Sequence, residues 1–103
     1  MASTLRQEAE RFLANVPEEY MFKCCDGRIL KNIQELRDCL NGMTDETFSY
    51  QVNKQKNDFS NWVKDVIGDE KLATDLRKSP TKTHAYIIVV ARVAFLSKLA
   101  LAS

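Results

Sequence analysis

The sequence has little glycine and proline, with three Gly and two Pro among 103 residues. So few chain-breaking residues exclude a long low-complexity or disordered segment. Three isolated glycines also cannot build the glycine-rich loop that cradles phosphate groups. Because 45% of the residues are hydrophobic, a chain of this length can bury one core without a metal or a disulfide. We therefore predict a single domain over residues 1–103.

Histidine and cysteine are also scarce. His84 is the only histidine, so no histidine pair or triad can be assembled. The three cysteines, Cys24, Cys25 and Cys39, fit neither a disulfide framework nor the spaced pairs of a zinc site. Adjacent residues on a strand point to opposite faces, so Cys24 and Cys25 cannot readily chelate one ion. We predict reduced thiols, no catalytic, cofactor-binding or metal-binding residues, and no enzymatic activity.

The charges are close to balance. Fifteen Lys and Arg oppose fourteen Asp and Glu, which gives a formal net charge of +1. There is no overall field to draw the protein onto nucleic acid or an anionic membrane, so such a contact would need a local patch. The first eight residues already include charged side chains, and they lack the apolar stretch of a signal peptide. Together with the cysteine pattern, this predicts a cytoplasmic protein.

What the sequence does contain is a succession of helix signals. Sets of apolar residues at helical spacing each follow a residue suited to capping a helix. The predicted caps are Thr4, Asn32, Thr44, Asn57 or Asp58, and Asp69. Gly42 and Gly68 stand where the second and fourth helices should end, and Pro80 stands at the start of the last. Asp26-Gly27 between two apolar runs predicts a hairpin, because both residues tolerate positive φ.

These signals define the expected fold class. We predict a mainly α protein, a compact bundle of about five to six helices with one small β-hairpin near residues 20–30. The first helix should end at Pro17, the fourth and fifth should span 58–67 and 70–78, and the last should span about 80–102. A lone hairpin is marginal in water, so it should lie against the helices.

Several short segments resemble a known family. Asn57-Asp58-Phe59 followed by Trp62 carries most of the likeness, which runs from about residue 20 to residue 76. The other matching segments are Phe22–Cys25, Asp26-Gly27, Leu30–Asn32, Glu35-Leu36, Asp65-Val66, Gly68-Asp69 and Leu72-Ala73. The chain resembles a small helical domain family of archaea and bacteria whose function is unknown. The resemblance implies a helical fold and no established activity. Members of that family often have histidine where this chain has Gln51.

The polar residues of this motif have two interpretations. Asn57, Asp58 and Asn61 beside Trp62 could form a small recognition site with an aromatic platform. Asn and Asp are also preferred helix caps, and Trp62 falls on the apolar face of its helix. We favour the second interpretation, in which these residues cap a helix and build the core.

The fourth and fifth predicted helices resemble a helix-turn-helix in outline. Two short helices, 58–67 and 70–78, flank a glycine in a tight turn. The outward face of the second helix would offer Lys71, Thr74, Arg77 and Lys78 to nucleic acid. Glu70 and Asp75 interrupt this patch, and the net charge of +1 lacks the concentrated basic footprint of such domains. A small DNA-binding regulator is therefore the alternative hypothesis and not the main one.

The apolar stretch from Ala85 to Ala102 is the most distinctive feature of the chain, and it lies outside the family resemblance. A helix that is apolar on every side belongs in a membrane, in a core or at an interface. Arg92 near its middle disfavours a membrane, because a central Arg costs roughly 2.5–3.5 kcal/mol on insertion scales. Core and interface remain equally open. An interface would use Tyr86, Val89, Val90, Val93 and Leu96.

The main prediction is therefore a non-catalytic interaction or assembly module. The expected partner is a second copy of the chain or another protein, held by the last helix. Neither nucleic acid nor a membrane is favoured, and no small-molecule ligand or cofactor is predicted.

Overall fold

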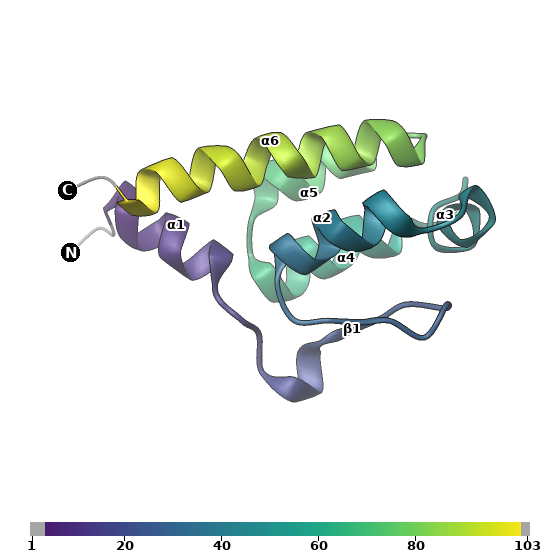
Figure 1. The fold of residues 1–103 in the computed structure, drawn as a ribbon, viewed down its shortest axis with the longest axis horizontal. Helices are drawn as coiled ribbons and strands as arrows, with labels where there is room; N and C mark the ends of the chain where they lie inside the picture. The colour runs from purple at the N-terminus through teal and green to yellow at the C-terminus, as the bar shows by residue number, and fades with distance from the viewer. Residues whose placement is uncertain (1–3, 102–103) are drawn as a thin grey trace.

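The computed structural model describes residues 4–101, and over this range the chain is mainly helical (Figure 1). The α-helices are α1 (Leu5–Leu13), α2 (Ile33–Gly42), α3 (Asp45–Gln51), α4 (Asp58–Trp62), α5 (Glu70–Arg77) and α6 (Lys82–Leu101). The chain also forms two short turns, the 3-10 turn η1 (Glu18–Tyr20) and the π turn η2 (Val63–Ile67). There are two strands in the described residues, β1 (Phe22–Lys23) and β2 (Ile29–Leu30). The predicted fold class, a helical bundle with one small hairpin, is confirmed.

Side-chain caps fix the beginnings of the first five α-helices. Each cap oxygen accepts a hydrogen bond from a backbone N–H three residues further on, which is worth about 1 kcal/mol per helix. The caps are Thr4, Asn32, Thr44, Asn57 and Asp69. The last helix begins later than predicted, at Lys82. There the Thr81 hydroxyl accepts from the N–H of His84 at 3.1 Å, so Pro80 lies outside the helix.

The hairpin forms where predicted, with a wider loop than Asp-Gly alone would give. Phe22 pairs with Leu30 and Lys23 pairs with Ile29, which leaves residues 24–28 as the loop. Of the two turn residues only Gly27 has a positive φ, at 95°. The Asp26 carboxylate instead accepts from the N–H of Arg28 at 3.1 Å. Two backbone hydrogen bonds also hold the loop: the N–H of Cys24 donates to the carbonyl of Arg28 at 2.8 Å, and the N–H of Gly27 donates to the carbonyl of Cys24 at 3.0 Å.

The helix predicted over 58–67 is a regular α-helix only as far as Trp62. Beyond it, the N–H of Gly68 donates to the carbonyl of Val63, five residues back, at 2.8 Å. Gly68 itself is left-handed, with a φ of 88°, as its position after the helix predicted. This wider last turn leads directly into Asp69, the cap of α5.

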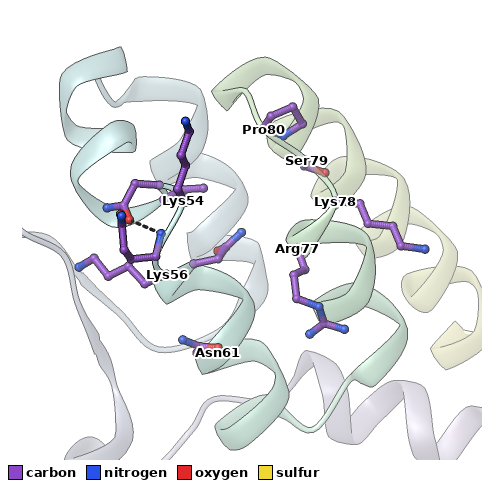
Figure 2. A pocket seen from close by; sticks show the side chains of 11 residues that line it. Lys54, Lys56, Asn61, Arg77, Lys78, Ser79 and Pro80 are labelled. Carbon is purple, nitrogen blue, oxygen red and sulfur yellow. Dashed lines mark hydrogen bonds between the residues drawn. The ribbon is translucent and has the colours of Figure 1, made fainter.

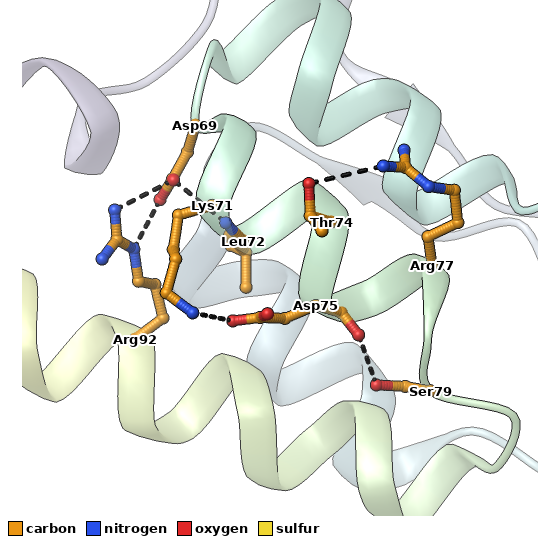
Figure 3. Close-up of polar contacts among 8 residues, drawn as sticks. All are labelled: Asp69, Lys71, Leu72, Thr74, Asp75, Arg77, Ser79 and Arg92. Carbon is orange, nitrogen blue, oxygen red and sulfur yellow. Dashed lines mark hydrogen bonds and ion pairs between the residues drawn. The ribbon is translucent and has the colours of Figure 1, made fainter.

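α6 runs along the molecule and packs against α1, α2 and α5 (Figure 1). Its buried side chains are Ala85, Val89, Val93 and Leu96. Arg92 also points inward, where its Nε and Nη2 donate to the two carboxylate oxygens of Asp69 at 2.7 and 2.9 Å (Figure 3). The Asp69 side chain is 1% exposed and that of Arg92 is 18% exposed. One buried carboxylate thus caps α5 and binds α6.

We predict that this ion pair is the most sensitive polar contact of the fold. Arg92→Met should lower the free energy of unfolding by about 3 kcal/mol, because it leaves the Asp69 carboxylate buried without its partner. Lys64→Met, which removes an exposed lysine from η2 and leaves α6 unchanged, is the matched control. Urea titration followed by circular dichroism measures both variants.

A second substitution separates the lost pair from lost packing. Asp69→Asn combined with Arg92→Met should recover part of the loss, since asparagine still caps α5 and no charge stays buried. If Arg92→Met were as stable as Lys64→Met, the pair would not have this role.

Candidate functional site

α6 presents an apolar outer face to solvent. This outer face consists of the exposed residues Ile87, Val90, Ala91, Ala94, Phe95, Lys98 and Leu101. Its large side chains are well exposed, with 56% for Ile87, 52% for Phe95 and 86% for Leu101. Lys98 is the one charged residue of the face. The described part of the chain leaves this face uncovered.

Only part of the interface predicted from the sequence lies on that face. Val89, Val93 and Leu96 are buried in the core of the single chain, so a partner cannot reach them. Tyr86 is half-buried and Val90 is 36% exposed. Because α6 is apolar all round, its sequence did not distinguish the buried face from the exposed one. Ile87 and Phe95 were missed for that reason.

Within residues 4–101, α6 is also the one helix whose length and composition would allow it to cross a membrane. A core helix of a soluble protein meets the same test, but such a helix is mostly buried, whereas 22% of this span is buried. Here α6 carries Arg92 near its middle, and that guanidinium is bound to a buried carboxylate of its own chain. The helix is therefore fastened to the domain through a polar contact that a lipid environment does not supply.

The residues predicted to contact nucleic acid do not form one patch. Lys71 pairs with Asp75 at 2.7 Å, which offsets its charge. The Thr74 hydroxyl accepts a long hydrogen bond of 3.4 Å from Arg77. Figure 3 shows Lys71 and Arg77 extending in different directions from α5. Arg77 and Lys78 instead help to line a cleft at the end of α5.

This cleft is lined by two stretches that are far apart in the sequence. One is the segment 52–57 between α3 and α4, and the other is the segment 77–80, which runs from the last residue of α5 toward α6 (Figure 2). Asn61 of α4 also lines the cleft. Its volume is about 710 Å³. The four charged residues that line it, Lys54, Lys56, Arg77 and Lys78, are all cations. Of these four cations, the sequence indicated only Arg77 and Lys78, which lie on the α5 side.

The family-like motif residues hold the helices together. Asn57 caps α4 and its amide also donates to the carbonyl of Leu76 at 3.1 Å, which ties α4 to the end of α5. The Trp62 indole is in the core and its N–H donates to the carbonyl of Tyr20 at 2.8 Å. The interpretation of Asn57 and Trp62 as cap and core is confirmed.

Gln51 and Asp58 form a second link. The Gln51 side chain is buried, accepts from the N–H of Cys25 at 2.8 Å and donates to the carboxylate of Asp58 at 2.6 Å. That carboxylate also binds Lys56 at 2.8 Å and raises its pKa. Gln51 therefore joins the hairpin loop to α3 and α4.

The structure brings together a group of metal-ligating side chains that the sequence did not suggest. The ligand atoms of Cys24, Asp26 and Cys39 all lie within 4.8 Å of one another, and both thiols are buried. Arg28 lies beside them, with its Nε 3.6 Å from the Asp26 carboxylate and its Nη1 donating to the carbonyl of Cys39. The guanidinium already balances the carboxylate.

The protonation of the thiols follows from burial. Burial raises the pKa of Cys24 from its ordinary value of 9.0 to about 12, and the nearby Asp26 carboxylate adds to the shift. Burial likewise raises the pKa of Cys39. Thiolates are the form that binds zinc and attacks disulfides. At neutral pH both thiols are protonated, so a metal ion that bound there would have to release their protons.

No family model, curated protein or solved structure matches this chain in sequence or fold. The resemblance carried by the Asn-Asp-Phe and Trp residues therefore stays a hypothesis. The apolar outer face of α6 and the cationic cleft are the two candidate functional surfaces of the described residues.

We expect the three thiols to differ sharply in reactivity. Cys25 is exposed, whereas Cys24 and Cys39 are buried. A disulfide reagent such as DTNB at pH 8 should therefore modify one thiol per chain quickly and the other two only after unfolding in urea. Cys25→Ser should abolish the fast phase. Fast modification of two or three thiols in the folded protein would contradict the burial.

The raised thiol pKa also predicts a loss of stability at alkaline pH. Between pH 9 and 12 the Cys24 thiol ionises in the unfolded chain and stays protonated in the fold. The unfolded state then binds fewer protons, so the free energy of unfolding falls as the pH rises. Relative to the wild type, a Cys24→Ser variant should lose less stability between pH 8 and 11. Parallel curves for the two proteins would contradict this assignment.

Proposed function

We propose that this protein is a non-catalytic interaction module that self-associates through the outer face of α6. The observation that carries the proposal is the row of exposed apolar side chains on a single 20-residue helix. Ile87, Ala91, Ala94 and Lys98 recur at intervals of four, three and four residues, which places them on one side of the helix. Large exposed apolar patches of this kind mark interaction sites.

A second copy of the chain is the partner that this face fits. Ala91 and Ala94 at its centre are small enough to let another helix approach closely. The net charge of +1 gives two copies little reason to repel each other. An antiparallel pair related by a twofold axis would also keep the two Lys98 side chains at opposite ends of the contact.

The expected association is weak. Each partly exposed apolar side chain gains about 1 kcal/mol when it is buried. Four such side chains on each copy give a total comparable to the cost of bringing two chains together, about 4–15 kcal/mol. At the low end of that cost a surplus of about 4 kcal/mol remains, which corresponds to a dissociation constant of about 1 mM. The dimer should therefore form in the high micromolar to millimolar range.

The alternative proposal, a small DNA-binding regulator, has less support. It rests on Arg77 and Lys78, because Lys71 is neutralised by Asp75. A helix-turn-helix reads bases through one exposed face of its second helix. On α5 that face carries acidic as well as basic side chains.

Self-association is tested by sedimentation equilibrium from about 10 µM to 1 mM protein. The wild type should shift from monomer toward dimer over this range, and Phe95→Asp should stay monomeric because it places a charge in the contact. Tyr50→Asp, which changes an exposed aromatic residue on α3, is the matched control and should dimerise. Thermal unfolding of Phe95→Asp checks that the fold is intact.

Two outcomes would count against the proposal. A wild-type protein that remains monomeric throughout the range would rule out the dimer. Equal dimerisation of the wild type and Phe95→Asp would place the contact elsewhere. Lys98→Leu provides the reverse test, since removing the one charge of the face should tighten the dimer.

A further inference from the structure

The cleft at the end of α5 carries more positive charge than the fold requires. Lys56 is offset by Asp58. Within residues 4–101, Lys54, Arg77 and Lys78 have no ion-pair partner, and no acidic side chain lines the cleft with them. Figure 2 shows these cations on the two separate segments that line the cleft, with the charged ends of Lys54, Arg77 and Lys78 pointing in different directions. The excess positive charge therefore comes from both sides of the cleft and not from one helix.

Helix stabilisation accounts for only part of this charge. Cations at the end of a helix offset the partial negative charge of its last carbonyls. At the end of α5 those carbonyls already have donors: the carbonyl of Leu76 accepts from Asn57, and that of Asp75 accepts from the hydroxyl of Ser79 at 2.7 Å. The helix end also does not explain Lys54, which comes from the opposite side of the cleft.

Both sides of the cleft are held in place by hydrogen bonds. The segment 52–57 closes on itself through the bridge between Val52 and Asn57, and the N–H of Asn53 donates to the carbonyl of Lys56 at 2.9 Å. The Asn57 amide then ties this segment to the carbonyl of Leu76. The backbone that carries the cations is therefore organised before any ligand arrives, which reduces the entropic cost of binding.

We propose that this cleft binds the phosphate groups of a nucleotide-sized ligand. Its volume of about 710 Å³ falls within the range of small-molecule sites. Arg77 offers the planar pair of donors that matches a phosphate, and Lys54 and Lys78 offer mobile point charges. The amide of Asn61 adds a neutral donor and acceptor beside them. The phosphates could belong to a free nucleotide or to a nucleic-acid backbone.

Binding is tested with two probes on the full chain. Calorimetry with ATP reports a free nucleotide, and fluorescence anisotropy with a labelled ten-residue thymidine oligonucleotide reports a nucleic-acid backbone. The double variant Arg77→Gln/Lys78→Gln should weaken binding of the preferred probe about tenfold. Lys54→Gln should weaken it severalfold from the other side of the cleft. Binding should also fall as salt is raised.

A matched variant separates a site from general charge. Arg11→Gln/Lys23→Gln removes the same two charges from α1 and β1, which do not line the cleft, and should leave binding unchanged. Tighter binding of ATP identifies a nucleotide site, and tighter binding of the oligonucleotide identifies a backbone site. The proposal is overturned if neither probe binds at millimolar concentration, or if the two double variants weaken binding equally. None of the substituted residues lies on α6, so this result is independent of dimerisation.

Discussion

The ion pair between Asp69 and Arg92 sets the arrangement of the other elements. Asp69 begins α5, and its carboxylate binds a residue at the middle of α6. A helix that is apolar on nearly every side could turn any face toward the core at similar cost. Arg92 removes that freedom, because turning another face inward would leave the buried Asp69 carboxylate without its partner. The outer face of α6 is therefore a consequence of where Arg92 points.

Three residues of the segments that suggested a family have a structural explanation. Asn57, Trp62 and Asp69 each satisfy backbone or side-chain groups that would otherwise be buried without a partner. These contacts join segments that are 19 and 42 residues apart for Asn57 and Trp62. They explain how the domain is built and leave its two available surfaces, one apolar and one cationic, for function. The two surfaces share no residue, so the chain could use both.

The cysteines illustrate a limit of spacing arguments. Cys24 and Cys25 attract notice because they are adjacent, yet the close pair in space is Cys24 with Cys39. Their approach depends on how the hairpin packs against α2. No periodicity in the sequence reports that packing. The neighbouring Arg28 also places a positive charge beside the cluster, with its Nε 3.6 Å from the Asp26 carboxylate.

Local features were determined by the sequence itself. The five side-chain caps, the left-handed Gly68 and the presence of the hairpin all depend on residues within a few positions of one another. The tertiary structure decided which face of α6 is buried, which thiols meet, and that Lys54 shares a cleft with Arg77 and Lys78. Each of these depends on contacts between distant segments, where several arrangements satisfy the same local preferences. Packing and the pairing of buried charge select among them.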